Sequence, residues 1–156
     1  MAMRAAGYAL GGRTEHFFLG GVLVSWLELA GAMAALWKLA RLDLPAADAD
    51  RAVFYAAVFP FAFFFGMAYS ESLYLLLMVG TVLAVRTRRW AVAGVVGAAA
   101  MVSRVNAIVA LPALAWMAWR AAGDDRHARI SAALALGAVA AGLPPWGGYT
   151  YHLRGH

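Results

Sequence analysis

The sequence predicts an all-α protein, a polytopic transmembrane bundle of about six membrane helices. Apolar residues make up 64% of its 156 residues and charged residues only 13%, whereas an average soluble domain has about 25% charged residues. The apolar residues fall in long runs between short charged segments. A soluble domain of this length could not bury so much apolar surface, because its surface-to-volume ratio is too high. We therefore expect an integral, multi-pass membrane protein.

The predicted membrane helices correspond to six apolar runs, at residues 16–37, 52–67, 72–85, 90–103, 105–119 and 130–149. At 1.5 Å per residue the first run spans a hydrocarbon layer about 30 Å thick. The four middle runs, of about 14–16 residues, reach only roughly 21–24 Å as straight helices. We expect residues 1–15 to form an external N-terminal segment and residues 16–156 to form a single transmembrane domain.

Basic residues give this bundle an orientation. The net charge is +5, and nine of the thirteen Lys and Arg residues lie in the loops 38–51, 86–89 and 120–129, three in each. By the positive-inside rule these loops face the cytoplasm. Short basic clusters of this kind are topology signals, and the chain has no basic stripe interleaved with stacking aromatics, so no nucleic-acid partner is expected. Abundant Ala, Gly and Arg favour a bacterial plasma membrane; in a eukaryote the endoplasmic reticulum would be the location.

Residues 59–73 carry the most informative pattern. Pro60 should end or kink its helix, because proline has no backbone N–H. A group of bulky aromatics follows, which we expect to form a membrane-embedded wall: Phe61, Phe63, Phe64 and Phe65. Four polar residues come next: Tyr69, Ser70, Glu71 and Ser72. One of the two serines could cap the following helix with Glu71 in its first turn, and this structural role is the alternative to a catalytic one.

Polar turns at residues 69–72 and 104–106 fall on the external side of the predicted bundle. Since the middle helices are short and arginines hold their cytoplasmic ends, we expect these turns to lie below the outer lipid surface. Backbone at that depth must be covered by protein or line a wet cavity. The sequence therefore predicts an outward-facing polar depression with Glu71 and Arg104 near its floor. The alternative is that the helices are longer and the turns lie among the lipid headgroups.

The same segment resembles the signature of the PIG-V-type mannosyltransferases, which include the second mannosyltransferase of GPI-anchor assembly and many bacterial relatives. The matching residues are Pro60, Ala62, Phe63, Phe64, Tyr69, Ser70, Glu71, Ser72 and Leu73. Further matches follow downstream: Trp90, Ala93, Gly94, Ser103, Arg104, Asn106, Leu111 and Pro112. Ala107 stands where the family usually has glycine. The resemblance covers about residues 15–155 and is specific where the Tyr-Ser-Glu-Ser segment combines with Arg104-x-Asn106.

This resemblance implies a GT-C-type fold and a membrane glycosyltransferase that takes a sugar, typically mannose, from a polyprenyl-phosphate donor. Arg104 is the expected phosphate ligand, because a guanidinium group matches the fork of phosphate oxygens. The other expected substrate-binding residues are Asn106, Tyr69, Ser70 and Ser72. The phenylalanines at 61, 63, 64 and 65 would line a groove for the prenyl chain, and Glu71 is the candidate general base. The donor sugar lipid and the bilayer are the expected partners, with no metal site.

The catalytic acid of the family lies in an external loop upstream of the matched residues. Only Glu15 and Glu71 are acids on the predicted external side of this chain. The sequence therefore resembles a truncated part of a larger enzyme, and we expect no transfer activity from the isolated chain if that loop is missing.

Two other functions fit the same composition. A transporter or channel module would use Glu28, in the middle of the first run, together with Glu71 and Arg104 on a polar pathway; we expect Glu28 to face the bundle interior and to pair with a polar group. A non-catalytic membrane scaffold would need neither a catalytic cavity nor a polar pathway. Small residues at 94–100 and 137–142 predict close helix packing in all three cases.

Overall fold

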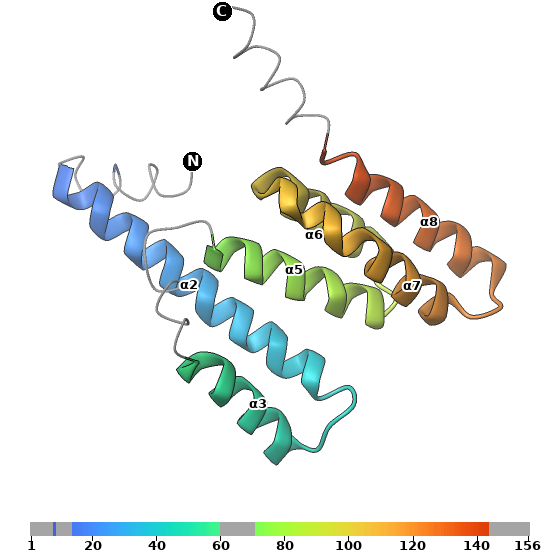
Figure 1. Cartoon of the computed structure of the whole chain (residues 1–156), viewed down its shortest axis with the longest axis horizontal. Coiled ribbons are helices and arrows are strands. Elements are labelled where there is room, and N and C mark those ends of the chain that lie inside the picture. Colours follow the sequence, from blue (N-terminus) through green and yellow to red (C-terminus); the bar gives the residue numbers. More distant parts are fainter. Residues whose placement is uncertain (1–7, 9–13, 60–70, 144–156) are drawn as a thin grey trace, which may run out of the picture. The chain divides into compact units, whose positions relative to one another are not determined.

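The computed structural model describes Tyr8, residues 14–59 and residues 71–143, and within these ranges every regular element is a helix (Figure 1). In chain order the elements are α2 (Thr14–Ala40), α3 (Ala46–Val58), α5 (Glu71–Arg86), α6 (Trp90–Ser103), the 3₁₀ helix η1 (Val105–Ala110), α7 (Leu111–Ala122) and α8 (Arg126–Ala140). The predicted all-α class is confirmed for the described residues.

By its internal contacts the chain divides into two compact units, Met1–Leu76 and Leu77–His156, which we call unit 1 and unit 2. The division falls within α5. Unit 1 contains α2, α3 and the beginning of α5, and unit 2 contains the rest of α5 and the elements that follow it.

In unit 1, α2 packs against α3 across a short turn. The prediction of a loop over residues 38–51 is wrong, because α2 continues to Ala40 and α3 already begins at Ala46. Pro45 is the N-cap residue of α3. Asp48 lies in the first turn of α3, where the positive end of the helix favours a carboxylate. The indole Nε1 of Trp37 donates a hydrogen bond of 2.8 Å to Oδ1 of Asp50, which ties the two helices together.

The end of α3 follows the prediction made from Pro60. The helix stops at Val58, and Phe59 is extended, with φ −57° and ψ 137°. A residue that precedes proline is pushed out of the helical region by the proline ring. The helix predicted over 52–67 is therefore corrected to 46–58 within the described residues.

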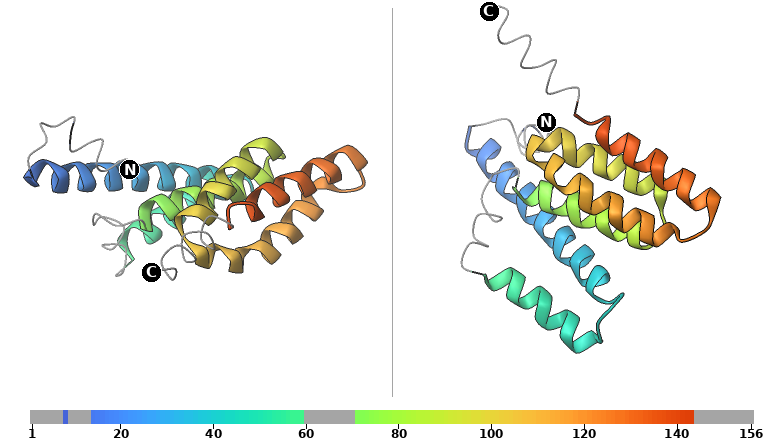
Figure 2. Two further views of the ribbon diagram at one scale, coloured as in Figure 1. Left: turned by 90° about the horizontal axis from the view of Figure 1, so that it is seen from above. Right: turned by 45° about the vertical axis from the view of Figure 1, so that its right-hand side comes forward.

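In unit 2, α6 packs closely against α8, and the two helices lie side by side in all views (Figures 1 and 2). A methyl group built on Gly94 would lie 3.2 Å from Cβ of Ala138, and one on Gly97 would lie 2.5 Å from Cγ2 of Val139. A methyl group on Gly142 would lie 2.5 Å from the backbone oxygen of Ala98. Close helix packing was predicted for both small-residue segments, and the structure shows that they pack against each other at Gly94, Gly97 and Gly142.

Alanines make up most of the core of unit 2. Its buried residues come from α5, α6, α7 and α8: Ala84, Val85, Ala93, Ala118, Ala122, Ala128 and Ala132. Trp90, Met117 and Leu136 pack against this cluster from its edge. Because alanine side chains are short, the helices of unit 2 lie close together and α7 also packs directly against α8.

Two further predicted segments need correction. The run 105–119 is not one helix: η1 covers Val105–Ala110, and α7 starts at Leu111. Pro112 lies in the first turn of α7, where a backbone N–H would have no partner within the helix. The last helix begins at Arg126 and not at 130, because the side chain of Asp125 caps it by accepting a 2.9 Å hydrogen bond from the N–H of His127. Its described part ends at Ala140.

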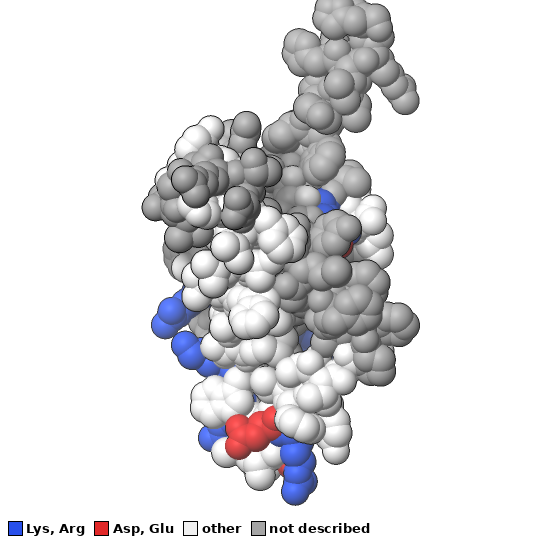
Figure 3. All heavy atoms as spheres, turned by 90° about the vertical axis from the view of Figure 1, so that its left-hand side faces the viewer, with Lys and Arg blue, Asp and Glu red and all other residues white. Residues whose placement is uncertain are grey.

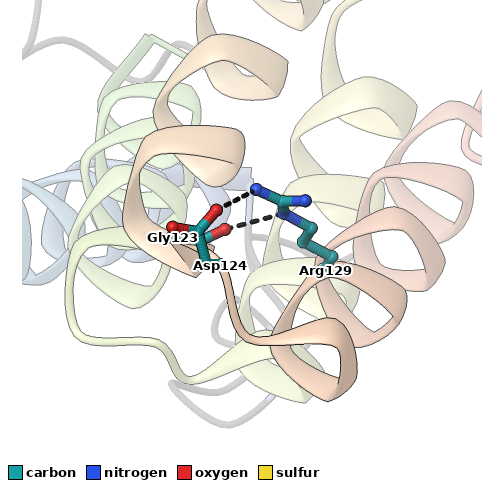
Figure 4. Close-up of polar contacts among 3 residues, drawn as sticks. All are labelled: Gly123, Asp124 and Arg129. Carbon is teal, nitrogen blue, oxygen red and sulfur yellow. Dashed lines mark hydrogen bonds and ion pairs between the residues drawn. The ribbon is translucent and has the colours of Figure 1, made fainter.

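The turn between α7 and α8 is held by Arg129 (Figure 4). Its Nε donates to the carbonyl oxygen of Gly123 at 2.7 Å, and its Nη2 lies 2.8 Å from Oδ1 of Asp124. Gly123 adopts φ 61°, in the left-handed region where glycine is the residue without strain. The guanidinium also lies over the ring of Trp119, 5.1 Å from its centroid.

Among the described helices, α2 alone is long and apolar enough to cross a membrane, over His16–Ala40. The other described helices are shorter, and α6 is the one of them that is apolar throughout. The multi-pass arrangement of about six helices therefore stays a prediction.

Large apolar side chains are nevertheless exposed on both units: Leu27 of α2 is 74% exposed, Val95 of α6 72%, Val109 of η1 79% and Leu134 of α8 71%. Figure 3 shows mostly uncharged side chains on the described surface that is visible, with the charged side chains in small groups between them.

Candidate functional site

Arg104 lies at a break between two helices of unit 2. It ends α6 and precedes η1, and its backbone is extended, with φ −150° and ψ 122°. Its N–H donates to the carbonyl oxygen of Ala100 at 3.1 Å, and its own carbonyl oxygen accepts from the N–H of Ala107 at 3.0 Å. The residue is half-buried. The helix break thus holds a partly desolvated arginine at a fixed backbone position.

The residues around Arg104 fix this break from both sides. The hydroxyl of Ser103 donates to the carbonyl oxygen of Ala100 at 2.7 Å, which occupies an acceptor at the end of α6. Asn106 is exposed in the first turn of η1, where its amide is accessible to a ligand. Ala107 is completely buried.

Glu71 is the first residue of α5, and Ser72 follows it in the same turn. Glu71 is half-buried with its Oε2 atom shielded from solvent, and Ser72 is completely buried. The free N–H groups of a first helical turn favour a negative charge there. Ser72 lies inside the helix and not before it, so it is not the N-cap residue.

Several predicted site residues lie outside the described residues: Tyr69, Ser70, Phe61, Phe63, Phe64 and Phe65. Glu71 belongs to unit 1 and Arg104 to unit 2. The predicted convergence of these two side chains on one polar depression stays a prediction.

Glu28 lies on a face of α2 that also carries small and polar residues. It is half-buried, and Ser25, one turn earlier, is completely buried. The expected polar partner of Glu28 is not found: its Oε2 and the hydroxyl of Ser25 have no hydrogen-bond partner among the described residues. Since a buried polar atom without a partner is costly, this face of α2 is a second place in the chain where polar groups lie among apolar ones.

Sequence reasoning missed a basic pocket at the other end of unit 2. An open pocket of about 610 Å³ is lined by Arg86, the last residue of α5, by Arg88 in the turn that follows, and by residues of α7: Trp116, Met117, Arg120 and Ala121. The loops 86–89 and 120–129 were predicted to share the cytoplasmic face, and this stays a prediction. Within unit 2, Arg86 and Arg88 line one pocket together with Arg120. The arginines had been interpreted as topology signals, and no local sequence pattern indicates that they gather around one cavity.

The backbone at Arg88 has an unusual conformation. Its φ of 56° is the one positive value at a non-glycine residue in the described part of the chain. The N–H of Arg89 donates to Ala84 at 2.8 Å and that of Arg88 to Val85 at 3.1 Å, which is the Schellman pattern that usually ends on glycine. An arginine therefore stands where glycine would be less strained, and its side chain lines the pocket.

Comparison with known proteins gives no match, either to a protein family, to a curated protein or to a solved structure.

Proposed function

We propose that the protein is a membrane glycosyltransferase of the PIG-V type within the GT-C superfamily, which moves a sugar, typically mannose, from a polyprenyl-phosphate donor to an acceptor on the extracytoplasmic or lumenal side. The observation that carries this proposal is the helix break at Arg104. There the chain interrupts apolar helices to hold a half-buried guanidinium between α6 and η1, within the Arg-x-Asn part of the family signature.

A lipid phosphate is the ligand that suits this arginine. Arginines among apolar membrane helices are rare, and they often lie on substrate or ion pathways. Guanidinium binds two phosphate oxygens at once and keeps its charge at any physiological pH. In the transfer step the bond between the anomeric carbon and the phosphate oxygen breaks, and the electron pair leaves with the polyprenyl phosphate. Arg104 would stabilise that developing negative charge, and the exposed amide of Asn106 would bind a sugar hydroxyl.

The acceptor hydroxyl forms the new bond to the anomeric carbon and must lose its proton. Glu71 is the proposed base for this proton. Its side chain lies at the start of α5, and one of its carboxyl oxygens is shielded from solvent. Ser72, Tyr69 and Ser70 are proposed to bind substrate hydroxyls beside it.

The proposed setting is a multi-pass membrane protein. Exposed apolar side chains on the short helices α6 and α8 support lipid contact for these helices too, since a soluble protein rarely exposes so many. Their charged ends would then lie at the membrane surface. A bacterial plasma membrane is the proposed location.

The experiment is a transfer assay in membranes from cells that express the protein from its own gene. With polyprenyl-phosphate mannose labelled in the sugar, we expect labelled product from the wild type and a loss of about 100-fold in Arg104→Lys, because lysine cannot form the forked contact. Arg126→Gln is the matched control, an exposed arginine in the first turn of α8 whose loss should leave transfer unchanged. Equal activity in Arg104→Lys and wild type would rule Arg104 out as the phosphate ligand.

A transport function is the second candidate, and the observation that favours it is Glu28. A carboxylate with a buried, unpartnered oxygen among the described residues of a membrane-length helix is typical of ion or proton pathways. If transport is the function, Glu28→Gln should abolish proton or cation flux into vesicles that contain the protein, while Arg104→Lys should keep it. The glycosyltransferase proposal expects no flux in either case.

A further inference from the structure

We propose that the pocket formed by Arg86, Arg88 and Arg120 binds the phosphate of an anionic lipid headgroup. This site is distinct from the proposed transfer site. The pocket lies at the beginning of α6 and Arg104 at its end, and the 14 residues of α6 correspond to a separation of about 21 Å.

The charge of the pocket indicates an anion. Three of its six lining residues are arginines, from two segments far apart in the sequence, and no acidic residue lines it in the described part of the chain. In that same part, no carboxylate pairs with the side chain of Arg88 or Arg120. By contrast, Arg129 in the same turn region is engaged by Asp124. Arg88 and Arg120 bring two positive charges to one cavity, and a bound phosphate would reduce the repulsion between them.

The backbone of Arg88 supports a binding role. The left-handed conformation at the end of α5 is strained for any residue with a side chain, and glycine would serve the helix end better. Strained backbone positions of this kind gather at binding sites. The arginine at this position lines the pocket together with Arg120 of α7.

The walls of the pocket favour a lipid over a free anion. Trp116 and Met117 supply its apolar side, and Trp116 is 65% exposed. Tryptophan beside arginine is typical of the membrane–water interface, where the ring lies among headgroups. Basic pockets between membrane helices on the cytoplasmic side bind anionic headgroups in this way.

The test is native mass spectrometry of the full chain in detergent, with phosphatidic acid, phosphatidylcholine or inorganic phosphate added. We expect a one-to-one adduct with phosphatidic acid and little with phosphatidylcholine. Arg120→Lys keeps the positive charge but cannot donate two parallel hydrogen bonds to the phosphate, and we expect it to weaken the adduct about tenfold. Arg88→Gly removes the guanidinium while relieving the strained backbone, so a similar loss there cannot result from unfolding.

Arg89→Gly is the matched control, because Arg89 follows in the same loop, is exposed, and does not line the pocket. It should keep the adduct within about twofold, since a screened surface charge contributes little. Equal losses in Arg88→Gly and Arg89→Gly would overturn the proposal in favour of diffuse attraction by the basic loop. Displacement of the lipid by inorganic phosphate at similar concentration would overturn the lipid assignment. Neither result affects the transfer assay, which depends on Arg104.

Discussion

Gly97 and Gly137 should respond in opposite ways to the same substitution. A methyl group on Gly97 would lie 2.5 Å from Cγ2 and 3.3 Å from Cγ1 of Val139, and 3.2 Å from Cγ2 of Thr81. Val139 is 2% exposed, and its branched side chain has one preferred rotamer in a helix, so it cannot turn away. A methyl group on Gly137 would meet no atom of the described residues within 4 Å. The substitution is therefore crowded at one position and unhindered at the other.

The magnitudes follow from two opposing terms. Replacing glycine by alanine inside a helix stabilises it by about 0.5–1 kcal/mol, and we expect this gain for Gly137→Ala. Overpacking a closed helix interface costs about 1–3 kcal/mol, so Gly97→Ala should lower the free energy of unfolding by about 1–2 kcal/mol net. Val139→Ala removes both crowding methyl groups. In that background Gly97→Ala should become stabilising, which gives a coupling free energy of about 2 kcal/mol between the two positions.

The assay is unfolding of the protein in mixed micelles with increasing sodium dodecyl sulfate, followed by far-ultraviolet circular dichroism. All four variants are compared with the wild type under the same conditions. If Gly97→Ala were as stable as Gly137→Ala, or if Val139→Ala did not rescue it, the close contact between α6 and α8 would not exist as described.

Three further changes test other local features by the same unfolding assay. Gly142→Ala should destabilise unit 2 by about 1–3 kcal/mol, because its methyl group would lie 2.5 Å from the backbone oxygen of Ala98, and an unchanged stability would contradict that approach. Gly123→Ala should cost about 1–3 kcal/mol through backbone strain alone, since the nearest atom is 3.9 Å away; no loss would show that the left-handed conformation is absent. Asp125→Ala should cost about 1 kcal/mol by removing the cap of α8, whereas Asn at this position should restore most of it, and equal stabilities would refute the capping role.

Local sequence signals predicted the local structure well. Pro60 was expected to end or kink its helix, and α3 ends at Val58 just before it, although the predicted helix had been drawn on to residue 67. Runs of glycine and alanine predicted close helix packing at Gly94 and Gly97, as the structure shows, but they did not indicate that α8 is the partner helix. At Gly137 the same reasoning did not apply, because its position on the helix turns it away from the partner.

Helix beginnings were missed where charged residues were taken as loop residues. Asp48 and Asp50 lie in α3, and Arg126 begins α8, because a charge at a helix end is compatible with the helix and acids in the first turn stabilise it. Asp125 is a capping residue that stands just before the helix, and it could have been identified from the sequence.

The site was predictable only in part. Arg104 was singled out as the one arginine between two apolar runs, and the structure places it at a helix break as expected. The pocket of Arg86, Arg88 and Arg120 depends on a contact between α5 and α7 and on a strained backbone at a non-glycine residue. No local pattern encodes either feature. The convergence of Glu71 and Arg104 likewise depends on long-range arrangement, which residue spacing does not determine.

The most direct test of the proposed function locates the donor lipid on the protein. Polyprenyl phosphate with a photoreactive group beside the phosphate is irradiated with the protein in vesicles, and the labelled peptides are identified by mass spectrometry. The proposal predicts labelling around residues 103–107 that unlabelled polyprenyl phosphate competes away and that Arg104→Lys strongly reduces. Labelling confined to the pocket of Arg86, Arg88 and Arg120, or unchanged in Arg104→Lys, would contradict the assignment of Arg104 as the phosphate ligand.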